Sequence, residues 1–288
     1  MPVITSKPFF TYQQQIDLLK ARGLIIQDES KAISTLRDIS YYRLSAYSLT
    51  LRTDDIFHDG TNFDDIVNLY HFDDRLRLIV LRFALCVENS MGAHISYHHS
   101  QKYGPLGYTN NQNFKDVMLH AAFLNRLSQK LERSAEPAIL HHKKDLDNTY
   151  PLWVAMEAMS FDMISKFYKN MRTADKKSIS GEYNGNRNLH HHVESWLHCC
   201  VNIRNIAAHG SRLYNRLLPV KVRCKRGDSE KFHSNSPFAC AYAIFFLLPF
   251  DEQKRLFKSL LKDLFLAFPK ADKGKLGFPD DWEAILTV

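Results

Sequence analysis

Apolar residues recur at helical spacing along most of the chain. The longest such pattern begins near Asp64 and runs to a turn-forming segment at 103–108, with apolar residues every three or four positions and Arg or Glu between them. Further helices are predicted at 114–134, 151–170, 189–208 and 237–268. No strand–helix alternation and no glycine-rich nucleotide loop interrupts these patterns. We therefore predict an all-α fold, which excludes the nucleotide-dependent α/β enzymes.

A small helical module is predicted at the N-terminus. Thr11 is suited to cap a first helix that ends near Gly23, and Asp28 opens a second. An apolar and aromatic element at 41–47 follows, and a polar loop at 54–62 separates the module from the rest. The predicted division of the chain is an N-terminal module, a main helical domain, and a C-terminal helical segment packed on that domain, at 1–62, 63–220 and 221–288.

Composition indicates the cellular compartment of the protein and the class of molecule that it binds. The chain has 288 residues, of which 45% are hydrophobic and 24% charged, with a formal net charge of +7. That charge favours a polyanion such as nucleic acid as partner. No uncharged apolar run of about 18 residues and no secretory signal is present, so no membrane association is expected. The five cysteines form no C-x-x-C pair, which indicates reduced thiols in a cytoplasmic protein.

The most informative segment follows the helical run at 189–208. It brings Arg204, Asn205, His209 and Arg212 close together. An imidazole can transfer protons near neutral pH, and a guanidinium can bind and neutralise a phosphate, so this set suits cleavage of RNA without a metal. Other Arg–His pairs of similar spacing begin at Arg52, Arg187 and Arg226. Those three pairs lie in polar connecting segments, so only the pair at Arg204 has the structural context of a site.

Helical geometry makes one copy of this segment an incomplete site. Arg204 and His209 would lie about 140° apart around an ideal helix. Asn205 and His209 share a face, His209 and Arg212 are three residues apart, and Gly210 can end the helix just after the histidine. Two copies facing each other would supply an acid, a base and several cations. We therefore expect a symmetric homodimer through this helix.

Other candidate chemistry is weaker. The consecutive histidines at 190–192 cannot all face one ion, and His94 and His98 have no evident third ligand, so no metal site is expected. Glu88 lies in an apolar stretch and needs a cationic partner if buried. It either pairs with an arginine of the 204–212 segment or is a surface residue or part of a structural ion pair. Three aromatic residues are assigned to core packing: Trp153, Phe161 and Trp196.

The segment from Arg204 to Arg216 resembles the R-N-x-x-x-H signature of the HEPN ribonucleases (higher eukaryotes and prokaryotes nucleotide-binding). Its form A-H-x-x-R-L-W/Y-N-R is similar to abortive-infection proteins of the AbiD/AbiF type. The N-terminal order K-P-x-x-T-x-x-x-Q-x-x-L-L-x-x-R-G-L followed by I-x-Y-Y-R-L-S-x-Y also resembles that family. The resemblance spans about residues 7–216. Three positions depart from the family pattern, where many relatives have Cys, His and Trp: Ala207, Gly210 and Tyr214.

The resemblance implies a HEPN-like helical bundle and an antiphage effector that cuts RNA by 2′-hydroxyl attack, without a cofactor. Arg204, Asn205 and His209 would be catalytic. Further residues would contact the substrate or orient the catalytic groups, namely Glu88, Arg212, Tyr214 and Asn215. A bound noncoding RNA would control the toxin. The alternatives are a non-catalytic module that binds RNA or a protein, and a toxin restrained by a protein antitoxin.

Overall fold

The computed structural model describes residues 8–183 and 185–287. Within them the fold is all-α, apart from one two-stranded hairpin. The helices are α1 (Tyr12–Ala21), α2 (Glu29–Asp38), α3 (Tyr41–Ser45), α4 (Phe63–Tyr103), α5 (Val117–Arg133), α6 (Pro137–Asp145), α7 (Leu152–Ala155), α8 (Phe161–Asn170), α9 (Thr173–Ser180), α10 (His190–Ala208), α11 (Pro237–Leu247), α12 (Asp251–Ala267) and α13 (Trp282–Ile285). The strands are β1 (Arg52–Thr53) and β2 (Ile56–Phe57).

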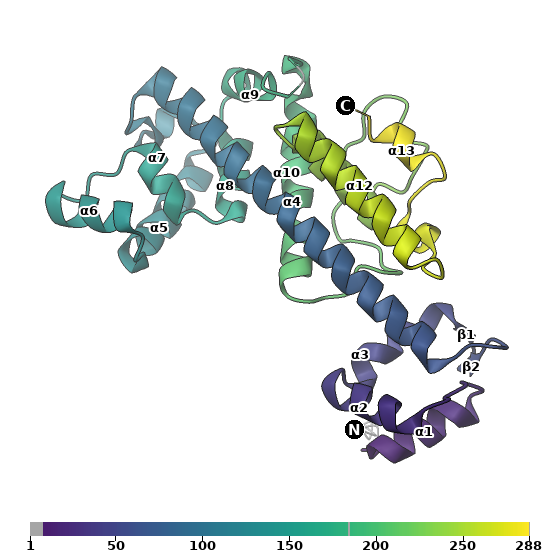
Figure 1. Cartoon of the computed structure of the whole chain (residues 1–288). Coiled ribbons are helices and arrows are strands. Elements are labelled where there is room, and N and C mark those ends of the chain that lie inside the picture. Colours follow the sequence, from purple (N-terminus) through teal and green to yellow (C-terminus); the bar gives the residue numbers. More distant parts are fainter. Residues whose placement is uncertain (1–7, 184, 288) are drawn as a thin grey trace, which may run out of the picture.

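Helix α4 is the axis of the molecule. It is 41 residues long and starts with a capping box, in which the side chains of Asn62 and Asp65 each accept from the other residue's backbone N–H. Figure 1 shows α4 running from the N-terminal module, past α12 and α10, to the region of α7 and α9. By length and composition alone α4 could cross a membrane. Here buried residues recur along it from Phe63 to His99, as expected of a core helix.

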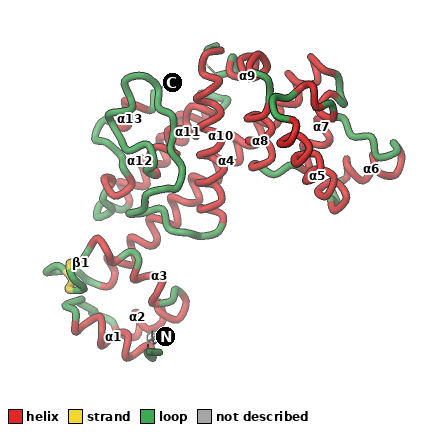
Figure 2. Tube along the Cα trace, turned by 180° about the vertical axis from the view of Figure 1, so that it is seen from behind, coloured by secondary structure: helices red, strands yellow, loops and turns green. Residues whose placement is uncertain are grey.

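The C-terminal part of the chain completes the core. Every residue of α11 is buried, and the helix packs against both α10 and α4. Ser236 caps it by accepting from the N–H of Ala239, and Pro237 occupies its first turn. Helix α12 packs along α4, as Figure 2 shows from behind. The C-terminal helices α11 and α12 thus pack on α10 and α4.

The N-terminal module has its own helix caps and a hairpin. Thr11 forms a capping box with Gln14, and Asp28 caps α2. The predicted polar loop at 54–62 proves to contain part of the β1–β2 hairpin. Asp54 and Asp55 form its turn with φ of +47° and +68°, the left-handed conformation that two-residue hairpin turns require.

Several sequence-based element predictions were wrong in detail. The helix expected at 151–170 divides into α7 and α8, and the one expected at 237–268 divides at Pro249, which cannot continue a helix. Helices α6 and α9 were not predicted. Phe161 and Trp196 are buried as expected, but Trp153 is 51% exposed and is not a core residue. An amphipathic pattern predicts the apolar face of a helix, but it does not show which large apolar residues another element will bury.

Candidate functional site

The candidate site lies at the C-terminal end of α10. After Ala208 the helix ends in a Schellman motif, in which the N–H of Gly210 donates to Ala207 (3.0 Å) and that of Ser211 donates to Ile206 (3.0 Å). Gly210 has a φ of +62°, which a residue with a side chain rarely adopts. The predicted helix end at Gly210 is confirmed. His209, the residue before it, is exposed.

Arg204 lies one turn earlier and contacts two of the predicted site residues. Its Nη1 donates to Oδ1 of Asn205 (3.2 Å), and its Nη2 lies 3.6 Å from Oε2 of Glu88 on α4. The side chain of Glu88 is 13% exposed and that of Arg204 is 31% exposed. The predicted contact between Glu88 and an arginine of this segment is therefore present. At 3.6 Å it is an ion pair and not a hydrogen bond.

Glu88 lies where three helices, α4, α8 and α10, come together. Burial raises the pKa of its carboxyl group, and the Arg204 guanidinium and the backbone N–H of Phe161 oppose that shift. Phe161 is the first residue of α8, where free N–H groups favour a negative charge. Glu88 on α4 thus links the start of α8 to Arg204 on α10, and holds the guanidinium on that side of the helix.

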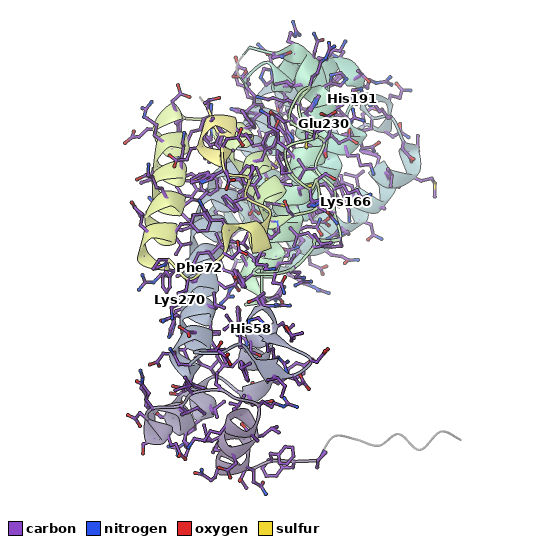
Figure 3. The ribbon with its side chains drawn as sticks, turned by 90° about the vertical axis from the view of Figure 1, so that its right-hand side faces the viewer. His58, Phe72, Lys166, His191, Glu230 and Lys270 are labelled. Atoms are coloured by element: carbon purple, nitrogen blue, oxygen red, sulfur yellow. The ribbon has the colours of Figure 1, made fainter. Side chains whose placement is uncertain are left out.

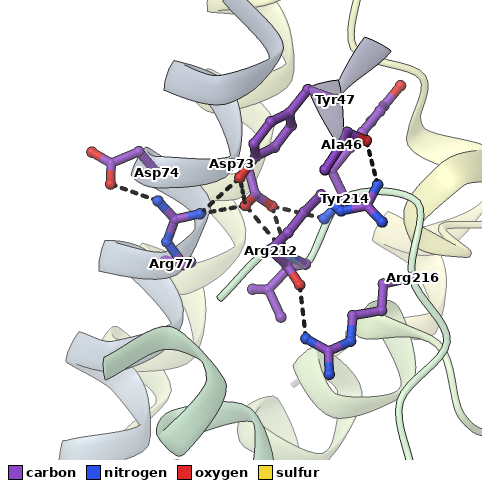
Figure 4. Close-up of polar contacts among 9 residues, drawn as sticks. Ala46, Tyr47, Asp73, Asp74, Arg77, Arg212, Tyr214 and Arg216 are labelled. Atoms are coloured by element: carbon purple, nitrogen blue, oxygen red, sulfur yellow. Dashed lines mark hydrogen bonds and ion pairs between the residues drawn. The ribbon is translucent and has the colours of Figure 1, made fainter. Parts of the chain in front are cut away.

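The segment after Gly210 is bound to two distant parts of the chain. Arg212 donates from Nη1 to the carbonyl of Ala46 in the N-terminal module (2.8 Å). The backbone N–H groups of Leu213 and Tyr214 donate to the carboxylate of Asp73 on α4, with shortest distances of 3.1 and 2.7 Å. Figure 4 shows the contacts to Asp73, with the bond between Arg212 and Ala46 beside them. The segment is therefore positioned by buried polar contacts.

Asp73 has no exposed surface and is the centre of this network. It forms an ion pair with Arg77 and accepts from the hydroxyl of Tyr47 (2.8 Å). Burial raises the pKa of Asp73, while Arg77, Tyr47 and the two backbone N–H groups oppose the shift. The sequence indicated no role for Asp73, which lies in an ordinary amphipathic helical pattern.

Tyr214 is buried, and the backbone of Asn215 is bound to the C-terminal part of the chain. The Tyr214 ring is 2% exposed and packs edge-on against Phe72, with ring centroids 5.9 Å apart. Its hydroxyl accepts from the N–H of Asp272 (3.3 Å). Asn215 has a φ of +51°, and its N–H donates to Lys275 (3.1 Å). The Tyr214 side chain therefore lies in the core, while the role of the half-buried Asn215 in contacting substrate or orienting the catalytic groups stays a prediction.

One cation next to Gly210 was missed by sequence reasoning. The position that a Cβ of residue 210 would occupy is 3.6 Å from Nη1 of Arg43, an exposed residue of α3. No acidic partner of Arg43 occurs among the residues that the structure describes. The only sequence feature that could have pointed to Arg43 is its position in the Y-Y-R-L-S sequence. Arg43 lies at the C-terminal end of α10, where the helix dipole also favours positive charge.

Several of the histidines considered for metal binding have other partners. His98 bonds through Nε2 to Glu182 (2.7 Å), and the His94 ring packs against Tyr183. His192 bonds to the carbonyl of Cys224 (3.2 Å). Within residues 8–183 and 185–287, no group of three or more potential ligands is positioned to hold a metal ion.

The fold and the site together define an all-helical protein with an Arg-Asn-His segment at the exposed end of a core helix. A family model described as Abi-like protein matches residues 34–215, well over half of the chain. The chain therefore belongs to the Abi-like family and is an abortive-infection defence protein. Searches of curated proteins and of solved structures gave no significant match.

Proposed function

We propose that this Abi-like protein is a metal-independent HEPN-type endoribonuclease of antiphage defence. The observation that supports this most is the arrangement at the end of α10. Arg204 and Asn205 are held together there by a hydrogen bond, and His209 is exposed where the helix ends. A guanidinium and an amide held beside one another, with an imidazole further along the same helix end, are suited to bind a phosphodiester and transfer protons to and from it.

The proposed reaction is an intramolecular transesterification. His209 takes the proton of the ribose 2′-hydroxyl, and the 2′-oxygen attacks phosphorus. The bond from phosphorus to the 5′-oxygen breaks, and that oxygen receives a proton from an imidazolium. Arg204 stabilises the negative charge on the phosphorane, and Asn205 orients the phosphate. The products are a 2′,3′-cyclic phosphate and a 5′-hydroxyl, so neither water nor an oxidant is consumed.

Two chains complete the proposed site. One chain offers a single His209, while the reaction needs a base and an acid at the same time. A homodimer paired through the end of α10 would supply both imidazoles, with Arg204 of each chain on the phosphate. Arg43 and Arg212 would add positive charge near the phosphate. We further propose that the protein is cytoplasmic. We also propose that a bound noncoding RNA restrains it, and the net charge of +7 agrees with RNA binding.

The ends of the RNA products test this proposal. Purified protein should cleave total RNA equally well with and without EDTA, because no metal takes part. The fragments should carry 5′-hydroxyl groups and cyclic or 3′-phosphates, which are detected by labelling with polynucleotide kinase before and after phosphatase treatment. Products with 3′-hydroxyl groups and a strict magnesium requirement would contradict the mechanism. RNA that co-purifies but stays intact after its release would favour a non-catalytic binding module.

A Glu88→Gln variant tests whether Glu88 positions Arg204. Glutamine can still accept from the Phe161 N–H but no longer attracts the guanidinium, so Arg204 should move while α8 stays capped. We expect the single-turnover cleavage rate to fall by up to about a hundredfold, the size of effect that a displacement of about 1 Å can cause. The matched control is Glu157→Gln, an exposed residue with no ion pair within the described chain. Equal rates for both variants would assign Glu88 a purely structural role.

A further inference from the structure

A second polar surface adjoins the candidate site along α10. A groove of about 780 Å³ lies between α8 and the segment 221–223, and Asn205 lines one end of it. The floor is one face of α10, with residues at helical spacing from His191 to Asn205. At the rise of an α-helix this floor is about 21 Å long. The groove therefore extends along α10 from near its N-terminal end to the candidate site at its C-terminal end.

Both walls of the groove are cationic. Lys166 and Lys169 project from α8, and Lys221 and Arg223 come from the segment after the site. Figure 3 shows Lys166 and His191 in the upper part of the molecule, away from the N-terminal module. His198 adds a further exposed imidazole to the floor. Positive charge on two facing walls is the usual arrangement for a polyanion.

The acidic residues in the groove are already neutralised. Asp162 bonds to Arg126 (2.8 Å) and to Lys166 (3.0 Å), and Glu194 pairs with the buried Lys176. By contrast, three exposed cations have no acidic partner within the described chain: Lys169, Lys221 and Arg223. Their charges are free to bind phosphate groups.

The wall formed by segment 221–223 is fixed in place. The Arg223 N–H donates to Oγ of Ser195 (2.9 Å), and Nε1 of Trp196 donates to the Arg223 carbonyl (2.9 Å). Ser195 Oγ also lies 3.4 Å from the carbonyl of Lys221. Because these contacts order the backbone in advance, binding in the groove costs little backbone entropy.

We propose that this groove, which we call the α8–α10 groove, binds a single strand of RNA through its phosphates and guides it to Asn205. This inference rests on the proposed function for the identity of the polyanion. Surfaces that recognise duplex RNA span about 16 base pairs, far more than this groove, so a single strand fits better. Among the described residues, the lining of the groove includes two histidines but no Phe, Tyr or Trp, the large rings on which bases usually stack. Binding should therefore depend on phosphate charge and not on sequence.

The test measures RNA binding in a protein that cannot cleave. The probe is a fluorescent oligouridylate, titrated against His209→Ala protein and against the same protein with Lys169→Ala, Lys221→Ala and Arg223→Ala. The triple substitution should weaken binding by about tenfold or more. It should also reduce the slope of log affinity against log salt by about 2, since each phosphate contact contributes about 0.7. A control with the same loss of charge replaces three exposed lysines outside the groove: Lys130, Lys144 and Lys273.

The outcomes separate this inference from the proposed ribonuclease activity. Equal affinities and salt slopes for the groove and control variants would overturn the groove assignment, even if wild-type protein cleaves RNA. No binding of the oligouridylate by the parent protein would overturn it as well. Selective loss of binding in the groove variant would support it, even if no cleavage were found.

Discussion

A His209→Ala variant is expected to lose RNA cleavage and cellular toxicity while it keeps its fold and its affinity for RNA. Positioned proton transfer contributes about 10²–10⁴-fold to the rate of such reactions, and in a dimer one substitution removes both the acid and the base. We therefore expect the single-turnover rate to fall by at least about 10³-fold. The measurement is cleavage of a labelled RNA by wild type and variant under identical conditions, with affinity measured separately.

The exposure of His209 makes this substitution informative. Its side chain is exposed and has no hydrogen bond within the described chain, so alanine should change the melting temperature very little. His71→Ala is the matched control, because His71 is an exposed histidine on α4, away from the groove. Cleavage by His209→Ala at the wild-type rate would contradict the catalytic assignment. Loss of RNA affinity without any cleavage by wild type would point to a phosphate-binding module.

The local features of the site could be predicted from the sequence because they depend on neighbours in the chain. The helical run before Arg204 and the glycine after His209 are sufficient to predict a helix that ends there. The pairing of Glu88 followed from a different argument, since a carboxylate in an apolar stretch needs a cation. That argument requires a partner but does not identify it, and a surface position for Glu88 stayed open. The contact with Arg204 exists because α4 and α10 pack together.

The long-range support of the site could not be predicted. Asp73 and Leu213 lie 140 positions apart in the chain, and Arg212 and Ala46 lie 166 apart. A single sequence contains no signal that links such positions. Tyr214 illustrates the consequence, because closeness to His209 in the chain suggested a place in the site. The left-handed Gly210 redirects the chain after α10, and the aromatic ring enters the core beside Phe72 instead.

An Asp73→Ala variant is expected to be the most destabilising of the substitutions considered. It removes the acceptor for the hydroxyl of Tyr47 and for the N–H groups of Leu213 and Tyr214. It also leaves Arg77, whose side chain is 5% exposed, without its buried partner. Removing one member of a buried ion pair typically costs about 3–5 kcal/mol of unfolding free energy. Urea unfolding followed by circular dichroism measures this loss as a lower midpoint.

The adjacent residue provides the control. Asp74 pairs with the same Arg77 (2.8 Å), but its side chain is 49% exposed, so Asp74→Ala should cost less than about 1 kcal/mol. Asp73→Ala should also lower the rate of RNA cleavage, measured without urea while the protein is still folded. The reason is that the segment after His209 loses its attachment to α4. Asp74→Ala should retain cleavage. Equal unfolding midpoints for the two variants would show that Asp73 does not hold this segment, and the positioning of His209 would then depend on the helix end alone.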